Sequence, residues 1–177
     1  MGYVVSRLTS DNAGLASDFH VSPNSCENPE YYEEYIKLNA IGDHQKGMGV
    51  THVLLDEEQK RLLGFITLRA TSLVSEGYDG VKNVHPALEI AELAVEEKFE
   101  RQGVGTTLLA LAIDIADELR SNMVGIRHIV VCADKAAVGF YQKFGFGKLS
   151  SLYEVLHDGW NDLCEPLCIT LPEMEFS

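Results

Sequence analysis

The chain has 177 residues, of which 46% are hydrophobic and 23% are charged, and its formal net charge is −13 at pH 7. This length and composition are typical of a single globular domain with its own core. No apolar run approaches the roughly 20 residues that a membrane-spanning helix requires. The negative charge argues against general affinity for nucleic acid, since phosphate contacts need Lys and Arg.

The start of the chain and the cysteines both point to a cytoplasmic protein. The N-terminal residues lack the basic and apolar regions of a signal peptide. The four cysteines, Cys26, Cys132, Cys164 and Cys168, are widely scattered. Cys164 and Cys168 are four positions apart without a matching His or Cys pair, so no zinc site is expected. We expect free thiols, with Cys132 as a small buried hydrophobe in the run IVVCA.

The first half of the chain predicts strands and helices in alternation. Residues 3–8 are β-prone, residues 11–19 fit a short helix, and a second helix over residues 29–42 has Pro29 in its first turn with Asn28 as its cap. The apolar runs at residues 50–55 and 62–68 flank a polar turn and predict a hairpin. Residues 70–86 contain Gly, Ser and Asn and are interpreted as a long loop.

The second half alternates more regularly. Residues 104–119 form an amphipathic helix, residues 126–133 a buried strand, and residues 135–144 another helix. Further strands are predicted at residues 146–149 and 167–171. The alternation indicates a mixed α/β domain. Residues 87–100 are ambiguous, because helix propensity competes there with a short strand that would end in a glycine loop.

That glycine loop, within FERQGVGTTLL, can bind a phosphate group. Gly103 and Gly105 permit close approach of a ligand, and the helix that follows offers unpaired N–H groups and a positive dipole end. Two glycines alone are a weak signal, since many turns have them. The loop is not a P-loop, because no Lys follows Gly105, and it is not a dinucleotide fingerprint, because Leu108 replaces the third glycine.

Two longer segments together are more specific. ELAVEEKFERQGVGTTLL followed by IVVCADKAAVGFYQKFGF resembles the GNAT superfamily of N-acetyltransferases, mainly over residues 50–149. The resemblance implies one acetyltransferase domain over residues 1–177, with a mostly antiparallel central sheet, a splayed strand pair and flanking helices. It implies acetyl-CoA as co-substrate and no metal. The chain departs from the family loop at Glu100, where Gln or Arg is usual.

The resemblance also implies the cofactor-binding residues. It makes residues 88–95 a strand whose backbone binds the pantetheine arm, with Leu93, Ala94 and Val95 as candidates. The Val95 N–H is expected to stabilise the carbonyl oxygen in the transition state. The amides of residues 101–106 are expected to hold the pyrophosphate. The complete set is Leu93, Ala94, Val95, Arg101, Gln102, Gly103, Val104, Gly105, Thr106, Asp134, Ala137 and Phe140.

Acetyl transfer also needs an acid for the departing thiolate and a neutral amine. Tyr141 matches the family tyrosine and is the candidate acid, although a tyrosine on an amphipathic helix can be a core residue. Glu89 matches the family's base glutamate. Glu92 is the other carboxylate option, on the opposite side of the strand, and water or the weaker candidates His85 and His128 remain open.

The acceptor is expected to be a primary amine, and acidic residues near the expected acceptor site suit a cationic one. The oligomeric state is open, with a homodimer as one option. The chain is similar to toxin-type acetyltransferases that act on aminoacyl-tRNA, but its acidity opposes a nucleic-acid substrate. An inactive acetyl-CoA-binding module is the other alternative.

Overall fold

The computed structural model describes residues 2–58, 60–155 and 164–173. The chain divides into two compact units. Unit 1 comprises residues Met1–Arg69 and Ile90–Ile113, and unit 2 comprises Ala70–Glu89 and Asp114–Ser177. The fold is mixed α/β, as predicted, and its mostly antiparallel sheet contains one parallel pair, β4–β5.

Unit 1 is a sheet with helices on both faces. Its strands run in the order β1 (Tyr3–Arg7), β2 (Val50–Asp56), β3 (Leu62–Glu76) and β4 (Lys82–Val95), of which β3 and β4 continue into unit 2. Both β1 and β2 pair antiparallel with the next strand. The hairpin predicted for β2 and β3 is therefore confirmed.

The helical layer on one face of unit 1 is a nearly continuous segment. It consists of α1 (Pro29–Glu34), a π-helical turn (Tyr35–Asn39) and α2 (Ala40–Gln45). Asn28 begins it, since its side chain accepts a hydrogen bond from the Tyr31 N–H at 3.3 Å. The helices and the strands share one buried cluster, to which the strands contribute Val53, Leu55, Leu62, Phe65 and Ala94 and the helices contribute Tyr35, Ile36 and Ala40.

On the other face, β3, β4 and α3 (Val104–Asn122) approach one another closely at Gly64. A Cβ atom at this position would lie 2.9 Å from the Ala94 carbonyl oxygen, 2.9 Å from Val104 Cγ1 and 3.0 Å from Leu108 Cδ1. Only glycine leaves room for this packing. The start of α3 and the end of β4 are thus fixed against the same residue of β3.

Unit 2 contains the rest of β3, β4 and α3, together with β5 (His128–Asp134), β6 (Gly147–Lys148), β7 (Tyr153–Val155) and β8 (Cys164–Thr170). The strand order continues β4-β5-β8-β6, and β7 pairs with β3. A 3-10 turn (Lys135–Ala137) leads into the short helix α4 (Val138–Gln142). Within the described residues, no helix is both long and apolar enough to cross a membrane.

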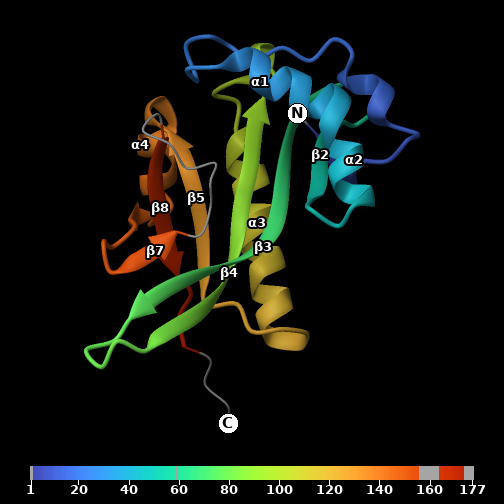
Figure 1. Ribbon diagram of the computed structural model, residues 1–177. Helices are drawn as coiled ribbons and strands as arrows, with labels where there is room; N and C mark the ends of the chain where they lie inside the picture. Colours follow the sequence, from blue (N-terminus) through green and yellow to red (C-terminus); the bar gives the residue numbers. More distant parts are fainter. Residues whose placement is uncertain (1, 59, 156–163, 174–177) are drawn as a thin grey trace. The chain divides into compact units, whose positions relative to one another are not determined.

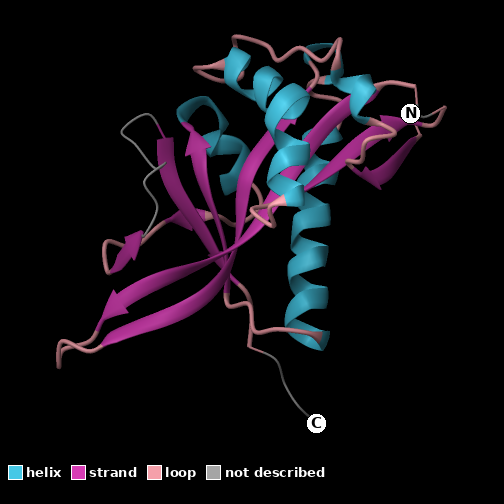
Figure 2. Ribbon diagram, turned by 45° about the vertical axis from the view of Figure 1, so that its right-hand side comes forward, coloured by secondary structure: helices cyan, strands magenta, loops and turns pink. Residues whose placement is uncertain are grey.

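The prediction of a long loop at residues 70–86 is wrong. These residues belong to a long β3–β4 hairpin whose turn is confined to residues 77–81, and Figures 1 and 2 show its tip extending away from β5 and β8. The turn is closed by the Gly77 N–H, which donates to the Val81 carbonyl at 2.9 Å. The prediction failed because the Gly, Ser and Asn residues of this segment were interpreted as loop residues, whereas Ser72 and Ser75 lie within β3 and Asn83 lies within β4. Pro86 also lies within β4, where its carbonyl accepts a bond from the Arg127 N–H.

The predicted helix at residues 11–19 is also wrong in extent. Only Ala13–Ala16 are helical, as a single 3-10 turn. The polar residues around it form local bonds instead, with the Thr9 N–H donating to the Asn12 side chain at 2.8 Å. Such Asx bonds compete with helix formation.

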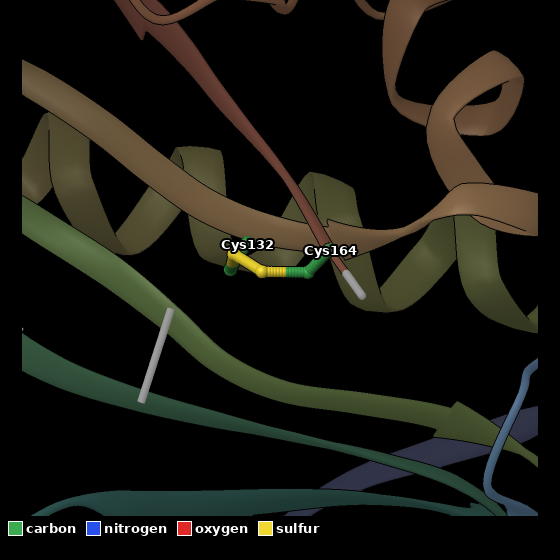
Figure 3. Close-up of a disulfide and its surroundings, with 2 residues drawn as sticks. All are labelled: Cys132 and Cys164. Atoms are coloured by element: carbon green, nitrogen blue, oxygen red, sulfur yellow. A yellow bond between two sulfur atoms is a disulfide. The ribbon is translucent and has the colours of Figure 1, made fainter. Parts of the chain in front are cut away.

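The expectation of four free thiols is wrong for two of them. Cys132 on β5 and Cys164 at the start of β8 form a disulfide, with Cα atoms 5.5 Å apart (Figure 3). The two strands pair antiparallel, with Cys132 opposite Pro166 and Cys164 opposite Asp134, so the cysteines face each other diagonally. Cys26 and Cys168 are thiols.

We predict that Gly64→Ala lowers the free energy of unfolding by about 1–3 kcal/mol, because the added methyl group must displace backbone as well as side-chain atoms. Urea denaturation measures the change. Gly42→Ala in α2 is the matched control, since a Cβ there meets nothing within 4 Å, and it should be neutral or stabilising by up to about 1 kcal/mol. Equal stability of Gly64→Ala and the wild type would contradict the packing at Gly64.

We predict that loss of the disulfide destabilises the protein by about 2–4 kcal/mol, because the two cysteines are 32 residues apart and the crosslink restricts the unfolded chain. The measurement is urea denaturation of the wild type with and without a thiol reductant. Cys164→Ser should match the reduced wild type and should not respond to reductant. A wild type whose unfolding is unaffected by reductant would oppose the prediction.

Candidate active site

The loop that precedes α3 in unit 1 has two residues in the left-handed region. Arg101 has φ 59° and Gly103 has φ 88°. A non-glycine residue adopts this conformation only at a cost, and such residues cluster at functional sites. The loop is held from both ends, since Gln102 Nε2 donates to the Lys98 carbonyl at 2.9 Å and the Thr107 N–H donates to the Gly103 carbonyl at 2.9 Å.

This loop fits an anionic group. Left-handed residues turn successive backbone N–H groups toward one side, which creates a concavity that suits anions. The 19-residue helix α3 begins immediately afterwards at Val104, and its first turn has no acidic residue. A Cβ built on Gly103 meets nothing within 4 Å, so the space above it is open. Glu100 lies before the left-handed turn and is half-buried.

The end of β4 presents backbone groups in two directions. The Glu96 N–H donates to the Leu63 carbonyl of β3 at 2.9 Å. Because backbone groups alternate along a strand, the amides of Leu93 and Val95 point to the edge of β4 opposite β3. Ala94 instead directs its backbone toward β3 and places its side chain in the core. Among the three predicted strand residues, Leu93 and Val95 therefore direct their backbone groups away from β3.

The junction between β4 and the loop is fixed by a buried carboxylate. Glu96 Oε2 accepts a hydrogen bond from the His20 N–H at 2.7 Å, and the Glu97 N–H donates to the His20 carbonyl at 2.8 Å. Sequence reasoning missed this contact, which joins residues 76 positions apart. The loop thus begins from a rigid point.

Glu89 and Glu92 have different surroundings. Glu89 is only 2% exposed, and it belongs to the part of β4 in unit 2. Glu92 belongs to unit 1 and is half-buried, and its Oε1 accepts a hydrogen bond from the Tyr31 hydroxyl of α1 at 2.6 Å. Burial raises the pKa of Tyr31 above its ordinary value, and the hydrogen bond to Glu92 raises it further by a smaller amount. The phenol therefore remains a donor at physiological pH.

The remaining predicted residues lie in unit 2. Tyr141 on α4 is 5% exposed, and its ring lies edge-on to Phe140 at 5.1 Å and to Phe146 at 5.6 Å. Asp134 caps the 3-10 turn before α4, since its side chain accepts a bond from the Ala136 N–H at 3.0 Å. Ala137 ends that turn. Asp134 thus has a structural role whether or not it contacts a ligand.

A family model for acetyltransferases (GNAT family) matches residues 13–146. The chain belongs to this family. It is an N-acetyltransferase with acetyl-CoA as its co-substrate. The described residues contain no group of three or more His, Cys, Asp or Glu side chains that would hold a metal ion.

Solved GNAT structures share this fold. A tyrosine-to-phenylalanine variant of the toxin AtaT is 20% identical, with 95% of this chain and 89% of that chain covered and a TM-score of 0.75. A tyrosine-to-phenylalanine variant of KacT is 17% identical, with 96% and 95% covered and a TM-score of 0.74. AtaT complexed with acetyl-methionyl-tRNAfMet is 19% identical, with 96% and 95% covered and a TM-score of 0.73. At these identities the likeness shows the fold.

The two histidines considered as weaker base candidates belong to a ring cluster in unit 2, in which His128 is buried and His85 is half-buried. His85, His128 and Tyr153 contact one another edge-to-face, with centroids 5.4–5.9 Å apart. His85 bonds Ser75 through Nε2, and His128 faces Thr170 through Nδ1 at 3.0 Å. His128 Nε2 is buried and has no hydrogen-bond partner among the described residues. Burial, with smaller effects of His85 and Arg127, lowers the pKa of His128.

We predict that His128 makes the protein less stable in mild acid. Because its pKa is lower in the folded state, the unfolded state binds more protons as pH falls below about 6.5. The free energy of unfolding should therefore decrease from pH 7 to pH 5, and His128→Phe should reduce the slope. His52, whose pKa burial also lowers, contributes a residual slope of the same sign.

Urea denaturation at a series of pH values gives this slope, and an NMR titration of the wild type gives the pKa of the His128 ring directly. The ring should titrate at lower pH than a free histidine side chain. Titration at or above the ordinary value would refute the prediction even if the variant does not fold.

Proposed function

We propose that this enzyme acetylates a primary amine, with cofactor contacts from the loop at residues 101–106 and from β4, and with Tyr141 as the general acid. The observation that carries the proposal is the pair of left-handed residues, Arg101 and Gly103, directly before α3. Backbone strain of this kind persists where it organises a binding site. Acetyl-CoA supplies both the pyrophosphate for this loop and the thioester from which the acetyl group is transferred.

The loop amides from Arg101 to Thr106 hold the pyrophosphate, since they lie at the positive end of the α3 dipole. The departure at Glu100 is tolerated because the backbone makes these contacts. The outward backbone groups of Leu93 and Val95 bind the pantetheine arm. The Val95 N–H then donates to the carbonyl oxygen as negative charge develops on it. Ala94 supports them by packing in the core.

The chemistry is a nucleophilic acyl transfer. The neutral amine forms a C–N bond to the carbonyl carbon, the C–S bond breaks, and Tyr141 donates its phenolic proton to the departing thiolate. The amine also loses a proton. Glu89 accepts it through water, because a carboxyl group that is 2% exposed has little direct access to an acceptor. Asp134, Ala137 and Phe140 position the segment that carries Tyr141 and contribute to the cofactor site.

The solved relatives include a toxin with an acetylated aminoacyl-tRNA, complexes of toxin with antitoxin, and a toxin–antitoxin complex with DNA. A tRNA acceptor requires a cationic surface, and the net charge of −13 opposes one here. A small or peptidic amine in the cytoplasm fits this charge better. A partner protein, if this chain has one, would have to complement an acidic surface.

Two measurements test the proposal. Calorimetry with acetyl-CoA, coenzyme A and NAD should show binding of acetyl-CoA and coenzyme A but not of NAD. Absence of binding by both coenzyme A species would refute the cofactor assignment.

We then predict that Tyr141→Phe lowers kcat by about 100-fold or more, within the usual effect of an acid–base catalyst, while the Kd for acetyl-CoA changes less than about twofold.

Turnover is followed as free coenzyme A thiol during a screen of amines. Tyr153→Phe is the control, because it removes a half-buried phenol elsewhere in unit 2 and should leave kcat unchanged. Equal loss of turnover and acetyl-CoA affinity in Tyr141→Phe would mean that Tyr141 has a structural role only.

A further inference from the structure

The residue that joins β4 to the glycine loop makes hydrogen bonds to three separate segments of unit 1. The Glu96 N–H donates to the Leu63 carbonyl of β3 at 2.9 Å, and the Glu96 carbonyl accepts a bond from the Phe99 N–H at 2.8 Å. The Glu96 side chain accepts a bond from the His20 N–H at 2.7 Å and is 5% exposed. One buried residue thus ties the end of β4 to β3, to the start of the loop and to the N-terminal part of the chain.

The N-terminal segment that the Glu96 side chain reaches is itself held on both sides. The His20 carbonyl accepts a bond from the Glu97 N–H at 2.8 Å. The next residue is tied to helix α1, since the Val21 N–H donates to Glu33 Oε1 at 3.0 Å. This segment is therefore a fixed support against which Glu96 can hold the end of β4.

The side chain of Glu96 is not used for the local turn. Glu96 occupies the N-cap position of the 3-10 turn Glu97–Phe99, yet it makes no side-chain capping bond there. A side-chain oxygen at an N-cap ordinarily accepts a bond from an N–H two or three residues further on. Here the bond goes to a residue 76 positions away. The contact therefore fixes the junction as a whole and does not merely close the turn.

The glycine loop has supports of its own that do not involve Glu96. Gln102 Nε2 donates to the Lys98 carbonyl, and the Thr107 N–H donates to the Gly103 carbonyl. Val95 lies on the other side of Glu96, as its direct neighbour in the strand. A displacement of Glu96 would accordingly turn the Val95 backbone before it disturbed the amides that face the pyrophosphate.

We propose that Glu96 is a positioning residue, whose contact with the His20 N–H aims the Val95 N–H at the thioester carbonyl. This inference rests on the proposed function, in which the Val95 N–H stabilises the developing oxyanion. Such a donor acts at about 2.7–3.1 Å from the oxyanion, and a misplacement of about 1 Å can cost roughly 100-fold in rate. Loss of the contact should lower kcat more than cofactor affinity, because the bonds within the loop remain.

Two conservative variants test the contact in the full-length enzyme, with butylamine as the probe acceptor. Glu96→Gln keeps an acceptor oxygen at the same reach. Glu96→Asp withdraws the oxygen by one carbon–carbon bond, about 1.5 Å, which takes it out of hydrogen-bonding range of the His20 N–H. Glu96→Gln should keep kcat within about threefold of the wild type, and Glu96→Asp should lower it at least 10-fold. The Kd for coenzyme A should change less than about threefold in both.

Thr67→Val is the matched control for stability. The hydroxyl groups of Thr67 and Thr51 bond each other at 2.8 Å in the interior of unit 1, so this variant also loses a buried hydrogen bond, on β3 and away from the loop. It should unfold at a lower urea concentration than the wild type and keep the wild-type kcat. A kcat that falls as far in Thr67→Val as in Glu96→Asp would assign the effect to stability and overturn the inference.

NMR gives a measurement that depends neither on turnover nor on the choice of amine. Acetyl-CoA has the thioester carbonyl and coenzyme A does not, so the Val95 amide resonance should move further with acetyl-CoA in the wild type and in Glu96→Gln. That difference should disappear in Glu96→Asp. Hydrogen exchange of the His20 amide should be slow in the wild type, and exchange as fast as that of a free amide would overturn the inference even if Glu96→Asp does not fold.

The remaining outcomes separate this inference from the proposed function. A wild-type kcat in Glu96→Asp, or an equal loss in both Glu96 variants, would overturn the positioning role and leave acetyl transfer intact. A coenzyme A affinity that falls as much as kcat would also overturn it, because the contact would then hold the loop and not Val95. Failure of the wild type to bind either acetyl-CoA or coenzyme A would instead refute the proposed function itself.

Discussion

The close packing at Gly64 determines the geometry of the cofactor side of unit 1. The Ala94 carbonyl and the Val104 and Leu108 side chains all meet this one residue of β3. It fixes the end of β4 and the first turn of α3, and the connecting loop has little freedom between them. The buried Glu96 carboxylate on the His20 N–H secures the same junction from the opposite side. The left-handed Arg101, which costs about 1–2 kcal/mol, is therefore imposed by its surroundings before any ligand binds.

Local sequence patterns predicted the elements whose residues interact with near neighbours. The helix from Val104 and the strands β2, β5 and β8 follow from hydrophobic periodicity, and the glycine loop follows from its spacing. The strand at residues 88–95 could be predicted only from the family resemblance, because helix propensity alone favours a helix there. The hairpin at residues 70–86 was missed because its Gly, Ser and Asn residues are typical of loops, although several of them lie within β3 and β4.

Contacts between distant residues were beyond prediction from one sequence. Tyr31 and Glu92 are 61 positions apart, and the register of β5 against β8 decides which cysteines can meet. Burial was equally hidden, because alternation along β4 does not reveal that Glu89 is enclosed while Glu92 reaches α1. The sequence ranked Glu89 above Glu92 only because Glu89 matches the family's base glutamate, and the structure gives the two carboxylates different surroundings.

The disulfide has a consequence for the connectivity of the chain. Cys132 and Cys164 enclose the segment that contains α4 and Tyr141, so this segment is part of a closed covalent ring. A peptide bond cut at any one point within the ring leaves both fragments attached. The tyrosine assigned to protonate the leaving thiolate would remain tethered to β5 and β8 after such a cut, and release of this segment by a protease would require either two cuts or prior reduction.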